Sequence, residues 1–97
     1  MHRLMSLQRD LDERFGARDR QSGPEFLALV LMEEVGELAE ALRRGDREHA
    51  KEEVGDVAFV AYALANVLGA DVEAQVRAKF LARRKDDVTR SWTDLPS

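Results

Sequence analysis

Apolar residues recur every three or four positions along most of the chain, which is the spacing of one face of an α-helix. Leu4, Leu7, Leu11 and Phe15 follow this spacing and predict a first helix that ends near Gly16. The same spacing continues through three later stretches. No stretch alternates apolar and polar residues as a half-exposed β-strand does. The pattern therefore predicts an all-α fold.

Capping signals set the boundaries of the later helices. Ser22, Asp46 and Asp71 each precede an apolar periodic stretch, and such residues accept hydrogen bonds from the first free N–H groups of a helix. Gly45 and Gly69 follow the second and third stretches, where a left-handed residue commonly ends a helix. We expect a polar loop at 17–23, followed by helices at about 24–44, 47–68 and 72–88.

The third predicted helix is apolar on every side. Between Val57 and Leu68 only Asn66 is strongly polar, and a helix that is apolar all round is normally buried all round. Three partner helices barely cover it in so short a chain, and Phe59 and Tyr62 lie off its main stripe. We therefore expect a four-helix bundle completed by homo-oligomerisation, as a homodimer or a tetramer.

Two carboxylate pairs, Glu34 with Glu37 and Glu53 with Asp56, have the i, i+3 spacing that makes residues neighbours on a helix. Paired acids usually lie on a solvated face. On a helical wheel, however, both pairs fall within apolar stripes formed by Leu27, Val30, Leu31, Leu38, Ala41, Val60, Ala63 and Val67. Buried carboxylates need a counter-charge, and oxygen ligands suit a hard cation such as Mg²⁺. The pattern predicts a metal site shared by two helices.

Other polar residues also point toward this predicted core. Lys79 and Arg83 share the apolar sector of the fourth helix, where they form either a salt-bridge network or a phosphate clamp. Asn66 serves either a buried structural hydrogen bond or a contact with a sugar or base. Glu33, at the edge of its stripe, is a further ligand, a base for the attacking water or an exposed bystander.

Composition narrows the class of protein. The chain has 97 residues and a formal net charge of −4, which predicts a single domain over 1–97 and argues against nucleic acid as a partner. It has no cysteine, so thiolate chemistry is excluded. The longest apolar run, from Val57 to Ala65, is too short to span a bilayer. The expectation is a soluble cytoplasmic protein with no membrane partner.

Three blocks carry a family resemblance: LMEEVGELAEA at 31–41, EEVGDV at 52–57, and Lys79-Phe80 with Arg83. Together they resemble the MazG-type nucleoside triphosphate pyrophosphohydrolases of the all-α NTP pyrophosphatase superfamily, and the resemblance spans roughly residues 27–84. It implies an enzyme that cleaves an NTP or dNTP between the α and β phosphates to give NMP and pyrophosphate. It also implies a role in clearing unwanted nucleotides.

The resemblance implies roles for individual residues. Glu34, Glu37, Glu53 and Asp56 match the family's ligands for Mg²⁺, with Mn²⁺ as an alternative ion, and Glu33 and Glu34 are the catalytic candidates. The residues that match substrate-binding positions are Lys79, Arg83 and Asn66. Longer members carry an N-terminal tryptophan motif, whereas the only tryptophan here is Trp92. Gln8 and Phe15 are therefore the candidates for contact with the base.

Two alternative functions remain open at this point. A phosphoribosyl-ATP pyrophosphohydrolase would use nearly the same chemistry, although the VGEL and VGDV blocks favour the MazG type. A non-catalytic helical module that binds nucleotides or a protein partner would show the same apolar third helix. His2 and His49 do not form the E-x-x-H pattern of a di-iron bundle, which counts against an oxidase.

Overall fold

All regular elements are helical within residues 6–88, the part of the chain that the computed structural model describes. The helices are α1 (Leu7–Ser22), α2 (Pro24–Arg43), α3 (Arg47–Leu68) and α4 (Val72–Val76), with a π-helical turn η2 (Arg77–Leu81) directly after α4. The predicted all-α fold is confirmed. Trp92, which the sequence predicts to pack in the C-terminal tail, lies outside the described residues.

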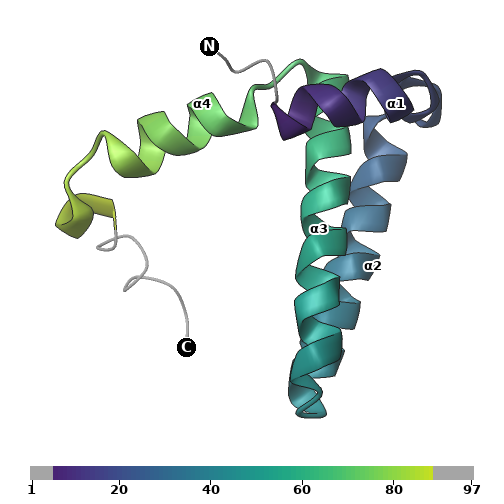
Figure 1. The fold of residues 1–97 in the computed structure, drawn as a ribbon, viewed down its shortest axis with the longest axis vertical. Helices are drawn as coiled ribbons and strands as arrows, with labels where there is room; N and C mark the ends of the chain where they lie inside the picture. The colour runs from purple at the N-terminus through teal and green to yellow at the C-terminus, as the bar shows by residue number, and fades with distance from the viewer. Residues whose placement is uncertain (1–5, 89–97) are drawn as a thin grey trace.

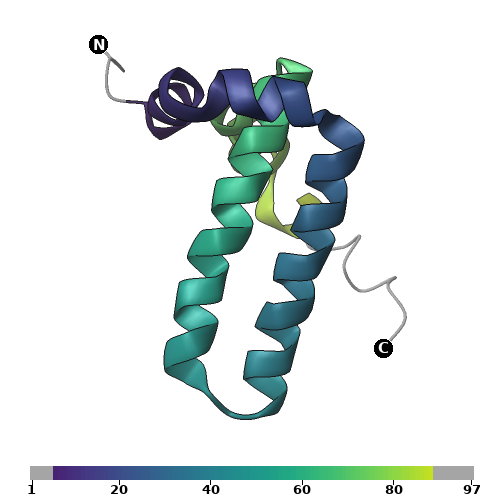
Figure 2. The same cartoon turned by 90° about the vertical axis from the view of Figure 1, so that its right-hand side faces the viewer.

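The helices α2 and α3 form a long antiparallel pair, and α1 crosses one end of it (Figures 1 and 2). Small and branched side chains fill the contact between the helices, which lets the two backbones approach closely. The buried apolar residues of these two helices are Leu27, Ala41, Ala50, Val60, Ala63 and Ala65. This pair is the frame that fixes the positions of both predicted acidic motifs.

The boundaries of α3 agree with the sequence signals. Asp46 caps its start, where the carboxylate accepts a hydrogen bond from the His49 N–H at 3.1 Å. Gly69 follows its end with φ of 74°, in the left-handed region where a Cβ is strained. Gly45 likewise follows the end of α2 and has a left-handed φ of 77°. These local signals therefore predicted the α2–α3 hairpin correctly.

The expected end of the first helix at Gly16 and the loop at 17–23 are wrong. The helix α1 passes through Gly16 and continues to Ser22, and the N-cap of α2 is Gly23, without a side-chain cap from Ser22. Asp12 and Arg20 form an ion pair of 2.9 Å that crosses over Gly16. A Cβ at Gly16 would lie 2.2 Å from Asp12 Oδ1. This glycine therefore accommodates the ion pair and does not end the helix.

The fourth helix is shorter than expected and does not pack inward. After α4, the chain widens into η2, where the Ala82 N–H donates to the carbonyl oxygen of Arg77 at 2.9 Å. Residues 72–88, called the arm below, extend away from α2 and α3 (Figure 1). The expected continuous α-helix over 72–88 is therefore wrong beyond Val76, and Val76, Phe80 and Leu81 are exposed on the arm.

Gln8 ties α1 to the junction between α3 and the arm. Its Nε2 donates to Asn66 Oδ1 at 2.9 Å and to the Ala70 carbonyl at 2.7 Å, while its Oε1 accepts from the Val72 N–H at 2.9 Å. In return, Asn66 Nδ2 donates to the Gln8 carbonyl at 3.2 Å. One side chain therefore joins the first residue of α4 to the last turn of α3.

We predict that Gln8→Ala lowers the free energy of unfolding by at least about 1 kcal/mol, because several part-buried polar groups lose their partner together. Urea titration followed by circular dichroism measures this loss. Gln21→Ala is the matched control, since Gln21 is an exposed glutamine on the same helix. Equal stabilities of the two variants would show that the junction contributes nothing.

None of the described helices is by itself long and apolar enough to cross a membrane. The pair formed by α3 and the segment Val72–Leu81 meets the criteria of length and composition together, with a bend of 101° between its two parts.

Candidate metal centre

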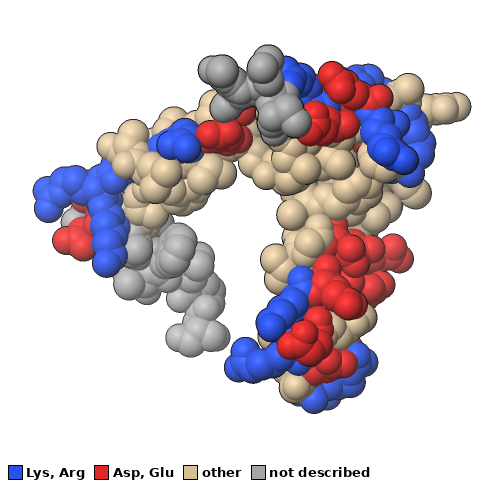
Figure 3. Space-filling model, in the orientation of Figure 1, with Lys and Arg blue, Asp and Glu red and all other residues tan. Residues whose placement is uncertain are grey.

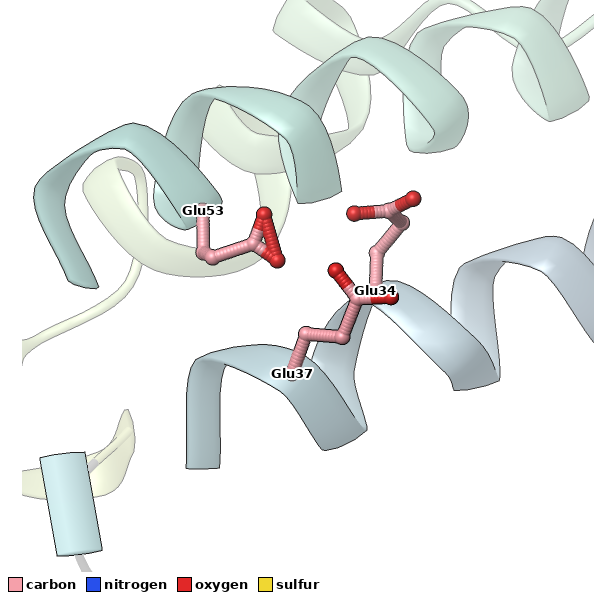
Figure 4. A group of neighbouring side chains, drawn as sticks. All are labelled: Glu34, Glu37 and Glu53. Atoms are coloured by element: carbon pink, nitrogen blue, oxygen red, sulfur yellow. The ribbon is translucent and has the colours of Figure 1, made fainter. Parts of the chain in front are cut away.

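Three carboxylates converge between α2 and α3. Glu34 and Glu37 come from successive turns of α2, Glu53 comes from α3, and Figure 4 shows their side chains directed toward one another. One oxygen atom of each lies within 4.8 Å of an oxygen of the other two. Glu53 is 3% exposed, Glu34 is partly buried and Glu37 is exposed. These three residues are called the acidic cluster below.

The acidic cluster is electrostatically unfavourable when every member is ionised. The adjacent Asp56 carboxylate, burial, and the proximity of Glu37 and Glu34 raise the pKa of Glu53 to about 7. Burial and the neighbouring carboxylates also raise the pKa of Glu34 above its ordinary value. Acidic side chains gather over the same part of the α2–α3 pair in Figure 3. At neutral pH, the cluster therefore holds a proton or needs a cation in its place.

The residues present fit a hard divalent cation. Glu53 Oε2 is buried and has no hydrogen-bond partner, although buried polar atoms are normally paired. A cation between the three side chains would supply this missing partner and remove the repulsion among them. Carboxylate oxygens are the ligands that Mg²⁺ takes, and a cluster open on the Glu37 side leaves room for water and phosphate in the coordination shell.

Asp56 and Glu33 flank the acidic cluster on its two helices. Asp56 is exposed and adjoins Glu53, so it is placed to complete the set of four carboxylates that the sequence predicted. Glu33 is also exposed and lines a cavity of about 450 Å³ next to Glu37. Arg44 and His49 line the same cavity. The described structure therefore brings together three of the four predicted carboxylates, Glu34, Glu37 and Glu53. The expectation that both acidic pairs face the core is wrong for Glu37 and Asp56, which are exposed.

Comparison with known proteins identifies the family. The model of the MazG nucleotide pyrophosphohydrolase domain matches residues 22–88, which include both acidic motifs and the arm. The chain belongs to the MazG nucleotide pyrophosphohydrolase domain family. The resemblance found in the sequence motifs is thus confirmed.

A curated relative of this MazG domain is the dATP/dGTP diphosphohydrolase of Cyanophage S-2L. The two are 44% identical over 62 residues, which is 64% of this chain and 51% of the relative. The chain thus spans about half the length of the curated relative that it matches. No solved structure matches the chain.

The predicted phosphate-binding residues lie apart from the acidic cluster in this MazG domain. Lys79 is exposed on η2, and Arg83 is exposed just after it, where its Nη2 donates to the Asp87 carbonyl at 3.4 Å. The expectation that both point into the core of their own chain is wrong, because the arm does not fold back along α2 and α3. Their role toward phosphate stays a prediction.

The predicted contacts with sugar and base have structural partners of their own. The Asn66 amide and the Gln8 side chain bond to each other at the junction described above. Phe15 packs edge-to-face on Phe59, with 5.3 Å between the ring centroids. A substrate role for these three residues stays a prediction.

Sequence reasoning missed Asp19, which is 2% exposed. It was assigned to a polar loop because Gly16 was taken as a helix end. The signal that could have identified it is the run 17–21, which contains neither glycine nor proline and lets α1 continue to Ser22. Extension of the helix turns Asp19 toward the start of α2, where it lines a cavity with Phe26 and Phe59.

Proposed function

We propose that this chain is a Mg²⁺-dependent nucleoside triphosphate pyrophosphohydrolase. The observation that carries the proposal is the acidic cluster, with three carboxylates from two helices inside 4.8 Å and one buried oxygen atom without a partner. Membership of the MazG family supports the same activity. Mn²⁺ is an alternative ion, because it also accepts carboxylate and water ligands.

The reaction adds one water across the anhydride between the α and β phosphates. One phosphorus–oxygen bond forms to the water oxygen, the bridging bond breaks, and pyrophosphate leaves with the bonding electron pair. Mg²⁺ bound at the acidic cluster would neutralise phosphate oxygens and lower the pKa of a coordinated water.

The chain's own residues hold and orient the reacting groups. Glu34, Glu37 and Glu53 are the proposed cation ligands, and Asp56 fixes the orientation of Glu53 or binds a cation itself. Glu33 lines the cavity beside Glu37, in reach of solvent, so it is the proposed base that accepts the proton of the attacking water.

Purine deoxynucleoside triphosphates are the substrates proposed first, because dATP and dGTP are in the name of the similar phage protein. The test incubates the protein with Mg²⁺ and each of the four dNTPs and NTPs, and also with phosphoribosyl-ATP. Separation of the products by anion exchange should give NMP or dNMP together with pyrophosphate. If no substrate yields pyrophosphate, a non-catalytic nucleotide-binding module becomes the better explanation.

We further propose that two copies assemble and that the arm of one copy lies beside the acidic cluster of the other. Large apolar side chains are exposed on α2, on α3 and on the arm, including Leu29, Met32, Val54, Leu68 and Leu81. Such surface normally marks an interface. In this arrangement Lys79 and Arg83 supply the positive charge that triphosphate needs and that the cluster lacks.

Complementation between inactive variants tests this arrangement. We expect Glu53→Gln and Arg83→Ala each to be inactive, and co-refolding of the two to restore about a quarter of the wild-type activity, since half of the random dimers contain one intact site. Arg84→Ala, at the neighbouring exposed arginine, is the control and should stay active. No recovery in the mixture, or a monomer by light scattering at micromolar concentration, would contradict the proposal.

A further inference from the structure

A second cavity, of about 260 Å³, lies where the end of α1 meets α2 and α3. Its lining is mainly apolar and includes Phe26, Val30 and Phe59, with one buried carboxylate, Asp19. The acidic cluster does not use this cavity. A chamber of this size holds a bicyclic heteroaromatic ring, and its aromatic side chains suit the faces of such a ring.

Asp19 keeps capacity to accept hydrogen bonds. Its ion-pair partner is Arg18, whose Nη2 lies 3.3 Å from Asp19 Oδ1 and whose side chain is 62% exposed. The Arg18 guanidinium also lies over the Phe15 ring, 4.9 Å from its centroid. A carboxylate has about four acceptor positions on two oxygens, so a single long contact leaves room for further donors in the cavity.

The cavity lies about one helical turn from the nearest residue of the acidic motifs on both α2 and α3. Val30 lines the cavity and Glu34 is four residues further along α2, which is about 6 Å of helix rise. On α3, Val60 lines the cavity and Asp56 is four residues earlier, with the same spacing. A nucleotide with its phosphates at the cluster would therefore extend its base into the cavity.

We propose that this cavity is the nucleobase site and that Asp19 selects guanine by accepting hydrogen bonds from its N1–H and N2–H groups. This inference rests on the proposed function, because the cavity is placed about one helical turn from the proposed phosphate site. The Phe15–Phe59 contact holds the Phe59 ring in place against the cavity.

The donor pattern of the bases explains the selection of guanine. Guanine presents two adjacent donors, which match the two oxygens of an ionised carboxylate. Adenine presents one amino group beside the N1 acceptor, so the second carboxylate oxygen faces a lone pair. Thymine has one N–H between two carbonyl groups, both of which a carboxylate repels. We therefore expect kcat/KM to be highest for dGTP, lower for dATP and lowest for dTTP.

Substrate analogues test this ranking without a change to the protein. Deoxyinosine triphosphate lacks the N2 amino group, so we expect its kcat/KM to fall roughly tenfold or more below that of dGTP. Equal kcat/KM values for the two nucleotides would overturn the role of Asp19. If no nucleotide is hydrolysed, calorimetric titration with dGMP, dIMP and dAMP makes the same comparison, and equal affinities for the three would likewise overturn that role.

The Asp19→Asn variant provides the second test. Its amide can donate to adenine N1 and accept from the N6 amino group, so the ratio of kcat/KM for dGTP over dATP should fall roughly tenfold to a hundredfold. Asp10→Asn, on the exposed first turn of α1, is the control and should leave the ratio unchanged. Pyrophosphate release with an unchanged ratio in Asp19→Asn would overturn the base site and leave the proposed hydrolase intact.

Discussion

Glu53→Gln is expected to lower turnover by at least about a hundredfold, because it removes the most buried of the proposed ligands and the charge that would hold the cation. The fold should be retained. Glutamine has nearly the same shape, and it relieves the repulsion among the neighbouring carboxylates. In metal-free buffer at pH 8, the variant should therefore melt at a higher temperature than the wild type. Initial rates of pyrophosphate release and a calorimetric melting scan measure the two effects.

The adjacent residue provides a matched control for this variant. Glu52 lies beside Glu53 in the sequence, but its side chain is 80% exposed. Glu52→Gln makes the same chemical change outside the cluster, so we expect activity and metal-free melting temperature close to those of the wild type. Equal activity in the Glu52 and Glu53 variants would remove Glu53 from the set of ligands.

Stability without metal should fall as the pH rises through the acid range to neutrality. The pKa of Glu53 is about 7 in the folded chain, above its ordinary value of 4.5. Between these values the folded chain binds more protons than the unfolded chain, so the free energy of unfolding decreases with rising pH. This contribution is fully present below pH 4.5 and is lost as the pH passes 7.

Mg²⁺ should reverse this trend if it binds as proposed, because it would replace the proton in the acidic cluster. A free Mg²⁺ concentration of a hundred times the dissociation constant adds about 2.7 kcal/mol to the free energy of unfolding. For a domain of this size, that gain raises the melting temperature by roughly 10–20 °C. The increase should be large at pH 8. It should shrink below pH 7, where each pH unit weakens binding by up to about tenfold.

Differential scanning calorimetry at pH 5.5 and pH 8, with and without Mg²⁺, measures both trends. The Glu53→Gln variant serves as the control and should show little dependence on either variable in this range. If Mg²⁺ raises the melting temperature by the same amount at both pH values, the ion binds outside the acidic cluster.

The hairpin and the acidic cluster could be predicted from the sequence because both depend on local signals. Asp46, Gly45 and Gly69 act within one turn of their positions, and the i, i+3 spacing within each acidic pair fixes the face that it occupies. Opposed apolar stripes then bring α2 and α3 together. The convergence of Glu34 and Glu53 follows from these two facts.

The direction of the arm could not be predicted, because it depends on contacts between segments distant in sequence. A helical wheel shows which face of a segment is apolar but not which surface covers that face. Gln8 bonds to residues more than fifty positions away, at Asn66, Ala70 and Val72. The wheel also assumed one continuous α-helix through Lys79 and Arg83, whereas Lys79 lies in the π-helical turn η2 and Arg83 follows that turn.

The error at Gly16 had a different physical cause, and it concealed Asp19. Glycine commonly ends a helix because it tolerates positive φ. Here Gly16 lies inside α1 and lets the Asp12 and Arg20 side chains lie close to the helix backbone. The Asp12–Arg20 ion pair occupies the space that a Cβ at Gly16 would fill, and its two residues lie eight positions apart in the sequence. Simple helix-end rules consider only single residues and their nearest neighbours, so they cannot detect such a pair.

The position of a bound cation would decide whether the acidic cluster is the catalytic metal site. Crystals grown with Mn²⁺ and a non-hydrolysable dGTP analogue allow the ion to be located by its anomalous scattering. We predict a peak between the carboxylates of Glu34, Glu37 and Glu53, in contact with phosphate oxygens of the analogue. If the analogue is fully bound but no anomalous peak lies between these three side chains, the proposed metal site is wrong.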